Sequence, residues 1–504
     1  MGLRSARDTI VAKLEEVAKI STNLEELAYA GASLGKLVDI SFDGSVDAAV
    51  YTIGYAGEIG FGVGAIYDEL LPAGFMKLTG HEDTAHPNYS KVMDLKGSIF
   101  FNTPPFWYKM VANVITISPV AASGFVIHEA FLREPNGFLH SGFMMGREGA
   151  NMVSKQGLDP LSTSSTHNPI STLGVANNYG GWIDACHNAG YVADTIFQWN
   201  ALTMLTLAQS QSGVSSAYCA FMDVAPFFPK GNNNNALKDV NDTSVSFAAS
   251  GYSNCALTGS GSKFAKTTHN GQDCGVSDVN GNMFKIVTGL TYLAKTGATG
   301  ANGSQAVAMP AHGLAVNDVI YFGGTPSSGT TYNTGAYTVT AVGDANNFTI
   351  GTVLSRAILA TDGVYSARYF RILKRTVKAN TLTSTNLLDE ANYDLLDLTG
   401  IVGSNSGAMY YGNGTETVLN FSTDTNSVAY KLAACGLPTT LGTSAGETAA
   451  FGNDYIYKYL RHGLVPVVGG YWDNAASAGS FTLYLGTVSV HSTDNVGGFA
   501  SVSL

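Results

Sequence analysis

The histidine and carboxylate side chains of this 504-residue chain offer few arrangements that could support metal or acid–base chemistry. His81, Glu82, Asp83 and His86 share one short segment, and all of these side-chain types can ligate a metal ion. We favour a polar surface loop as the interpretation, because acidic side chains are mostly solvated at the surface. Paired carboxylates of the kind that cleave glycosidic bonds do not stand out anywhere in the sequence. We therefore expect no metal at this loop.

The cysteines likewise give no catalytic or metal-binding pattern. They are odd in number, form no C-x-x-C pair, and stand at positions 186, 219, 255, 274 and 435. We therefore expect neither a disulfide framework nor a zinc site. Most of these thiols are interpreted as small buried apolar residues. A Ser/His/Asp triad is defined in space rather than in sequence, and that alternative stays open. The expectation is a protein that is not an enzyme and needs no cofactor.

Side chains suited to recognition gather near the end of the chain. The segment 471–484 combines aromatic rings with short hydrogen-bonding side chains, namely Tyr471, Trp472, Asp473, Asn474, Ser477, Ser480, Phe481 and Tyr484. Tyrosine and tryptophan present rigid amphipathic rings, and serine and asparagine add adaptable hydrogen bonds. Aromatic faces beside amides also suit sugars. For Trp472 and Phe481 the alternative is a place in the hydrophobic core.

Composition limits the class of protein that can carry these residues. Charged residues make up 13% of the chain, against roughly 25% in ordinary soluble proteins, and glycine is abundant at 58 residues. The many aromatic residues argue against disorder and favour loop-rich β structure. A net charge of −11 without a basic run argues against a nucleic-acid partner.

The same composition bears on membranes and targeting. No apolar stretch reaches the ~18 residues of a membrane span, so we expect no membrane insertion. The charged start of the chain is not a signal peptide. We expect a soluble protein that is synthesised in the cytoplasm.

Periodicity suggests which elements position the candidate residues. Apolar residues recur at helical spacing over residues 7–30, which predicts either an amphipathic helix packed on its own domain or a short docking or coiled-coil helix. From about residue 45, short apolar runs alternate with turn residues and predict short strands. Residues 182–190 and 194–210 predict two helices, the second capped by Asp194 and apolar along one face.

A change of composition marks an internal insertion. A Gly/Ala/Thr/Ser-rich stretch over 290–304 is typical of a linker, and a compact run of predicted strands and turns follows it. The chain therefore divides into an N-terminal helical segment (1–45), a large region in two parts (46–290 and 367–504), and an inserted small all-β domain (291–366).

Five pieces of the large region resemble a known fold. They are similar to the formylglycine-generating-enzyme type of C-type lectin fold, in the version found in bacteriophage virion proteins and in variable proteins of diversity-generating retroelements. Two parts of this resemblance are the most specific. One is Gly281-Asn282, which Met-Phe-Lys-Ile follows directly in the sequence. The other is the closing piece, with Gly469-Gly470-Tyr471-Trp472 and Gly498-Phe499. In chain order the pieces are residues 62–64 with 71–75 and 97–110, residues 146–160, residues 181–209, residues 268–290 and residues 467–502.

The sequence departs from the family pattern at a few of these positions. Val468 and Ala500 stand where arginines are usual, and Met283 to Ile286 replace a tryptophan-rich version. The insertion has its own likeness: His312-Gly313-Leu314 and residues 317–320, 337–339 and 344–350 resemble a small β domain of phage tail proteins. That domain is usually named for similarity to part of the ubiquitin-activating enzymes, and in phage proteins it implies a structural module.

The resemblance implies an α+β, C-type lectin-like domain with an N-terminal helix and an inserted small all-β domain. In the resembling proteins the closing segment is the exposed ligand-binding face, which gives Tyr471, Trp472, Asn474, Ser477 and Phe481 as candidate binding residues. The implied protein is a phage virion component in a tail fibre, tail tip or head fibre that attaches to a host receptor or glycan. It would contact other virion proteins and form an oligomer, most simply a trimer.

Two other functions stay open. The first is a decoration or cement protein of the virion without a receptor. The second, disfavoured, is a copper or iron oxidase-type enzyme. The related copper enzymes need a pair of reactive cysteines near the C-terminus, and past residue 290 this chain has Cys435 alone. The resemblance leaves open whether calcium is bound.

Overall fold

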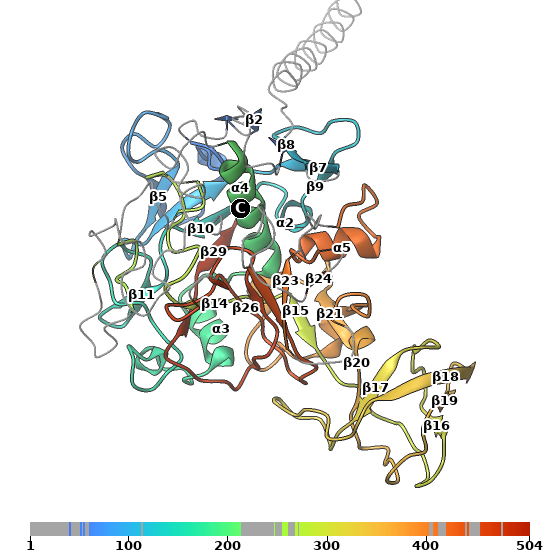
Figure 1. Cartoon of the computed structure of the whole chain (residues 1–504). Helices are drawn as coiled ribbons and strands as arrows, with labels where there is room; N and C mark the ends of the chain where they lie inside the picture. Colours follow the sequence, from blue (N-terminus) through green and yellow to red (C-terminus); the bar gives the residue numbers. More distant parts are fainter. Residues whose placement is uncertain are drawn as a thin grey trace, which may run out of the picture.

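The structure is a computed structural model with short strands in several small sheets and few helices (Figure 1). It describes residues 60–111, 114–212, 246, 255–260, 268–270, 272–402, 407–411, 420–438, 454–474 and 477–504, with four two-residue strands at 40–41, 51–52, 54–55 and 441–442. The helix expected over residues 7–30 and Cys219 lie outside the described residues. The mixed α and β composition agrees with the sequence prediction at this coarse level.

A six-stranded antiparallel sheet joins the two ends of the described chain. Its strands, in spatial order, are β13 (Val192–Ala193), β29 (Ala500–Ser503), β10 (Phe138–Ser141), β6 (Ile99–Thr103), β5 (Lys91–Asp94) and β4 (Phe75–Lys77). The last strand of the chain thus lies between β13 and β10. Every residue of β10 is buried, because both faces of the sheet are covered. Its polar residues His140 and Ser141 are buried with the rest of the strand, whereas β5 alternates between half-buried and buried residues.

A seven-stranded mixed sheet carries most of the closing segment. Its order is β24 (Leu441–Gly442), β23 (Gly407–Tyr411), β25 (Tyr455–Lys458), β27 (Leu483–Tyr484), β26 (Val467–Val468), β14 (Phe284–Ile286) and β28 (Val496–Gly497). Strand β14 pairs antiparallel with β26 and parallel with β28. Residues near 285 and near 467–497 therefore lie side by side, although almost 200 positions separate them.

Smaller sheets complete the main body. A four-stranded sheet contains β1 (Ile40–Ser41), β8 (Val114–Ser118), β7 (Trp107–Val111) and β9 (Val126–Ile127), and a three-stranded sheet contains β15 (Leu290–Tyr292), β21 (Phe370–Leu373) and β22 (Tyr393–Leu396). Two hairpins pair β2 (Tyr51–Thr52) with β3 (Gly54–Tyr55) and β11 (Gly146–Glu148) with β12 (Asn151–Val153).

The helices are few and mostly short. They are α2 (Glu129–Arg133), α3 (Tyr179–Asn188), α4 (Ile196–Ser212) and α5 (Val428–Ala434), with 3-10 turns η1 (Asp68–Leu70), η2 (Ile170–Leu173), η4 (Ala367–Tyr369), η5 (Ala379–Thr381) and η6 (Glu390–Asn392). Helices α3 and α4 confirm the two helices predicted over 182–190 and 194–210. Among the described helices, none is long and apolar enough to cross a bilayer.

Helix α4 differs from its prediction in two respects. All its side chains from Ile196 to Gln209 are buried, so the helix is enclosed on every side rather than along one apolar face. It packs against α2, α5 and β8. Its cap is Thr195, not Asp194, because the Thr195 hydroxyl accepts the Gln198 N–H at 3.1 Å and the Gln198 side chain accepts the Thr195 N–H at 3.0 Å. This is a capping box. The Asp194 carboxylate instead pairs with His140 at 2.6 Å.

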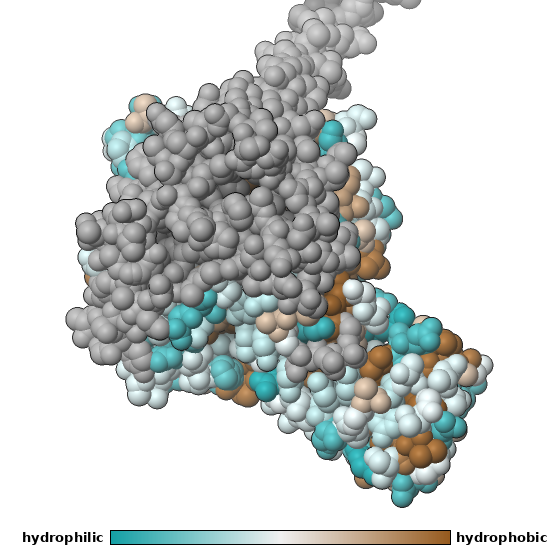
Figure 2. Space-filling model, in the orientation of Figure 1, coloured by the Kyte–Doolittle hydropathy of each residue, from teal (hydrophilic) through white to brown (hydrophobic). Residues whose placement is uncertain are grey.

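The segment expected as an insertion forms a five-stranded sheet of its own. The strands, in spatial order, are β16 (Ala306–Ala308), β19 (Asn347–Ile350), β18 (Tyr337–Asp344), β17 (Val319–Phe322) and β20 (Val364–Ser366). Figure 1 shows this module, in yellow, projecting from the body. Its surface mixes hydrophobic and hydrophilic residues (Figure 2) and includes the exposed side chains of Val316, Val342, Val353 and Leu359.

Candidate functional site

The two largest predicted binding residues lie in the protein interior. Trp472 is 7% exposed and Phe481 is 3% exposed. The Trp472 N–H donates to the carbonyl of Asn282 at 2.9 Å, and the Phe481 N–H donates to the Asp454 carboxylate at 3.0 Å. Their placement on a ligand-binding face is therefore corrected: both rings stabilise the closing segment from inside, which is the alternative considered for them.

The three other predicted binding residues are half-buried and shape one turn. The Asn474 side-chain oxygen accepts the Tyr471 N–H at 2.8 Å, and the Ser477 hydroxyl donates to the Asn474 carbonyl at 2.7 Å. The Asn474 oxygen and the Ser477 hydroxyl are thus used within the turn, whereas the Asn474 amide nitrogen donates to the Tyr455 hydroxyl at 3.4 Å. Of the five candidates, Tyr471 presents the largest ring at the surface.

Tyr471 belongs to a row of aromatic rings that extends across the seven-stranded sheet. Tyr457 and Tyr484 are opposite each other in the parallel pairing of β25 with β27, and their rings stack at 4.5 Å with an angle of 8°. The buried Phe284 ring connects the row, at 5.8 Å from Tyr484 and 5.1 Å from Tyr471. Tyr457, Tyr471 and Tyr484 are all half-buried, so part of each side chain remains at the surface.

An arginine borders this row. The Arg461 guanidinium donates to the carbonyl of Gly486 at 2.9 Å. Gly486 lies against the stacked rings: a Cβ at this position would meet the Tyr484 ring at 2.7 Å and the Tyr457 ring at 3.1 Å. Only glycine leaves room for the stack. We call Tyr457, Tyr471, Tyr484 and Arg461 the tyrosine face.

The tyrosine face has the chemistry of a recognition surface. Burial raises the pKa of Tyr471 and of Tyr484, so both hydroxyls stay protonated and can donate hydrogen bonds at neutral pH. Ordered tyrosine rings and an arginine lose little conformational entropy on binding, and these residue types dominate binding hot spots. The sequence analysis included Tyr471 and Tyr484 in the closing segment but missed Tyr457 and Arg461. The period-two spacing of Tyr455, Tyr457 and Tyr459 is the signal that could have indicated an exposed strand face.

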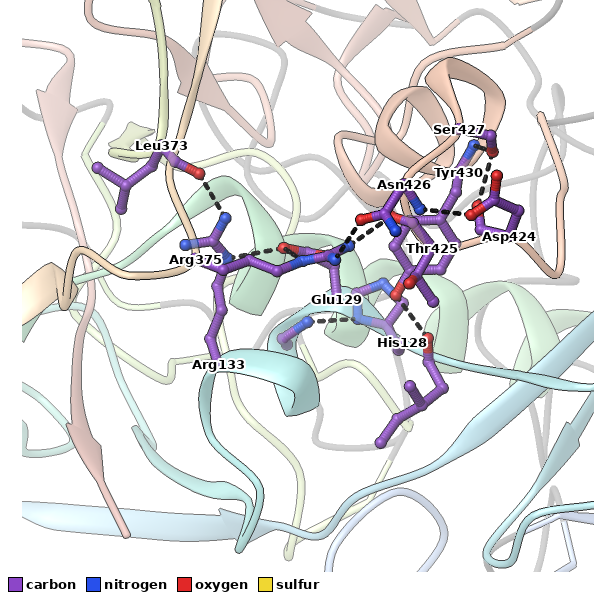
Figure 3. Close-up of polar contacts among 12 residues, drawn as sticks. His128, Glu129, Arg133, Leu373, Arg375, Asp424, Thr425, Asn426, Ser427 and Tyr430 are labelled. Atoms are coloured by element: carbon purple, nitrogen blue, oxygen red, sulfur yellow. Dashed lines mark hydrogen bonds and ion pairs between the residues drawn. The ribbon is translucent and has the colours of Figure 1, made fainter. Parts of the chain in front are cut away.

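A second polar cluster is centred on Glu129 (Figure 3). The buried Glu129 carboxylate accepts from Arg133 Nε at 3.0 Å and from Arg375 Nη2 at 2.7 Å. The two guanidinium groups also donate to backbone carbonyls of Leu373, Lys374 and Thr425. We call this cluster the Glu129 joint, because it connects α2 to the segments that precede β22 and α5.

Two cavities flank the Glu129 joint, but the charged groups of the joint already bind one another and the backbone. Two adjoining cavities of about 220 and 280 Å3 are both lined by Arg133 and Arg375. Each guanidinium nitrogen of these two residues already donates to a protein acceptor. Arg133 and Arg375 are therefore held in place by acceptors of the protein itself. The arrangement therefore supports a structural role.

The histidine-containing loop is also structural. His81 is buried, and its ring nitrogens are used by the backbone: Nε2 accepts the Ile66 N–H at 2.8 Å and Nδ1 donates to the carbonyl of Lys91 at 2.8 Å. Glu82 pairs with Lys77, and the Asp83 carboxylate accepts the Ala85 N–H. These side chains do not converge on a point, which agrees with the interpretation as a polar loop.

The cysteines that the structure describes are free and buried: Cys186, Cys255, Cys274 and Cys435. This confirms the sequence interpretation for these four thiols. Burial raises the pKa of each thiol, so the neutral form is favoured.

Comparison with known proteins adds no relative to this description. The chain matches no protein-family model, and no significant match was found among curated proteins.

Proposed function

We propose that this protein is a structural component of a bacteriophage virion, in a tail fibre, tail tip or head fibre. In this proposal the body has a C-type lectin-like fold and attaches the particle to a host receptor or glycan. The observation that carries the proposal is the tyrosine face. It offers half-buried rings and an arginine at the surface of the closing segment, where the resembling proteins bind their ligands.

The strand pairing supports the lectin-like part of the proposal. The two most specific pieces of the resemblance are far apart in the sequence but adjacent in space, since Lys285 pairs with Val468 and Phe284 pairs with Val496. Asn282, of the Gly-Asn signature, has a left-handed backbone with a φ of 61°, and its carbonyl accepts the Trp472 N–H. Asparagine is one of the few residues that adopt this conformation readily. The signature thus holds the closing segment in place.

Binding to a sugar or receptor fits the physical character of the face. Aromatic rings contribute apolar contact area while their hydroxyls hydrogen-bond, which suits a ligand with both apolar and hydroxyl-bearing faces. Residues 1–45 would dock the protein to other virion proteins or drive trimer formation, and the β module would serve as a structural spacer. Neither nucleic acid nor membrane insertion is part of the proposal.

The test is binding of the full-length protein to candidate host cells and to their extracted surface polysaccharides. We expect saturable binding that falls about tenfold or more in Tyr457→Ala and in Tyr484→Ala, as for hot-spot residues. Tyr67→Ala is the matched control, because Tyr67 is 71% exposed and lies outside the face. Equal binding by all variants would exclude the tyrosine face.

A second measurement separates the receptor function from a decoration function. The purified protein is added to virus particles that lack it. Attachment to such particles without any binding to host cells would favour a decoration or cement protein.

A further inference from the structure

Three potential metal ligands from distant parts of the chain converge behind the closing segment. One ligand atom each from Asp159, His167 and Cys255 lies within 4.8 Å of the others. His167 and Cys255 are fully buried, whereas the Asp159 side chain is 23% exposed and gives the cluster access to solvent. Thiolate, imidazole and carboxylate are the ligand types that zinc and similar divalent ions prefer.

The hydrogen bonds of His167 match those of a metal ligand. Nδ1 lies 3.0 Å from the carbonyl oxygen of Asp494, to which it donates, and Nε2 lies 3.0 Å from Asp159 Oδ1. Nε2 and Asp159 Oδ1 are thus in direct contact, and a divalent ion bound between them would replace that hydrogen bond. Metal-ligating histidines almost always donate their second N–H in this way, often to a backbone carbonyl.

We propose that Asp159, His167 and Cys255 bind a zinc-type divalent metal ion. In a tetrahedral zinc site the ligand atoms are roughly 3.3–3.7 Å apart, so these three atoms, which lie within 4.8 Å of one another, would have to shift to close around the ion. Three protein ligands leave the fourth position to water or another donor. This inference does not rest on the proposed function.

The charges around the cluster favour a cation. The carboxylates of Asp159, Asp278 and Asp494 all lie close enough to Cys255 to act on it electrostatically. Lys285 faces Asp278 and offsets part of this negative charge. A divalent ion would offset the rest and stabilise the thiolate.

A catalytic Cys–His–Asp triad is a less suitable interpretation of the same residues. Such a triad needs one histidine nitrogen on the carboxylate and the other on the nucleophile. Here the second nitrogen of His167 is directed to the Asp494 carbonyl instead.

The position of the cluster suggests that the metal is structural. The His167 ring contacts Trp472 edge-to-face at 6.4 Å, and the backbone of Ala256 bonds to the Asn282 amide through both its N–H and its carbonyl. An ion here would connect residues 159–167, residue 255 and the loop near 494. It would therefore brace the closing segment from behind.

The test is a cobalt titration of full-length protein that has been treated with a chelator and kept reduced. We expect one Co2+ per chain, a near-ultraviolet sulfur-to-cobalt charge-transfer band, and displacement of Co2+ by Zn2+. The band should be lost in Cys255→Ala and retained in Cys186→Ala, which removes a buried thiol elsewhere. Absence of the band, or an unchanged band in Cys255→Ala, would overturn the proposal.

A second variant keeps the test valid if Cys255→Ala does not fold. Asp159→Asn is conservative and partly exposed, and removing a charged ligand should weaken metal binding by about tenfold or more. Zn2+ should raise the melting temperature of the wild type more than that of Asp159→Asn at the same concentration. Equal affinity in the two proteins would contradict the proposed ligand set.

Discussion

The Glu129 joint and the tyrosine face both combine arginine with tyrosine, but the two regions use these side chains differently. In the joint, the guanidinium groups of Arg133 and Arg375 donate to Glu129 and to backbone carbonyls, and the Tyr430 hydroxyl donates to the carbonyl of Ile127 at 2.6 Å. In the joint, the Glu129 side chain is 2% exposed and that of Arg375 is 32% exposed. On the tyrosine face, the rings stack on one another and are all half-buried.

The difference shows which polar clusters can serve recognition. A cluster whose charged groups already bind one another and the backbone stabilises the fold, and a ligand that displaced those bonds would lose their contribution. Half-buried rings that are held rigid by packing can instead gain contacts without losing any. The tyrosine face is therefore a better candidate for ligand binding than the cavities beside Arg133 and Arg375.

The largest expected effect is the loss of the buried charge in the joint. Glu129→Gln leaves Arg133 and Arg375 without their shared counter-charge, so we expect a destabilisation of about 3–5 kcal/mol. Urea denaturation measures it. The control is Glu148→Gln, which removes an exposed ion pair with Lys155 and should cost less than about 1 kcal/mol. Similar losses in both variants would show that the joint is not the stronger contact.

The next effect is a pH dependence of stability that comes from His128, the residue before Glu129. Burial lowers the pKa of His128 to about 4, whereas an unfolded histidine titrates near pH 6.5. Between these values the unfolded chain binds a proton that the folded protein does not. The contribution of His128 is thus fully present above about pH 6.5 and is lost as the pH falls toward 4, by on the order of 3 kcal/mol.

The measurement for His128 is the slope of stability against pH in the wild type and in His128→Asn. The variant should lose stability less steeply with acid, whatever its stability at neutral pH. Parallel slopes would mean that His128 does not contribute to the acid sensitivity.

A smaller effect should come from crowding the ring stack. Gly486→Ala places a methyl group against the Tyr484 and Tyr457 rings, so we expect a destabilisation of about 1–3 kcal/mol, a changed near-ultraviolet circular dichroism signal and weaker ligand binding. Gly400→Ala is the matched control, because a Cβ there meets nothing within 4 Å. Unchanged ligand binding in Gly486→Ala would show that the ring stack does not contribute to binding.

The smallest effect concerns the turn below Tyr471. Asn474→Ala removes the acceptor of the Tyr471 N–H and should cost about 1 kcal/mol of stability, with a smaller loss of binding than Tyr457→Ala. Asn474→Asp keeps the acceptor of the Tyr471 N–H but loses the donor to the Tyr455 hydroxyl, so its stability should lie between those of Asn474→Ala and the wild type. If Asn474→Asp loses as much binding as Asn474→Ala, the amide itself contacts the ligand, as the sequence analysis suggested.

Local elements could be predicted where a local pattern encodes them. The apolar runs around residues 99–103, 107–111 and 114–118 predicted strands that the structure contains, and the two helices near 179–212 were found by spacing alone. The cap of α4 was missed because Asp194 and Thr195 are both good capping residues. Only the geometry shows that Thr195 pairs with Gln198 while Asp194 turns to His140.

The candidate sites depended on contacts that no local pattern encodes. Trp472 and Phe481 looked like binding residues by type, and their burial became visible only with the strands that cover them. The Asp159, His167 and Cys255 cluster has none of the spacing expected for a zinc site, which is why the sequence analysis expected none there.

The sequence by itself determined the mixture of short strands and turns, the scarcity of helices and the aromatic character of the closing segment, because period, capping and composition act over a few residues. Tertiary structure alone decided which aromatic rings remain at the surface and which distant side chains meet. Burial and ligand geometry depend on pairings such as β14 with β26 and β28, which join residues 181 to 212 positions apart. Such long-range contacts arise from the packing of the whole chain.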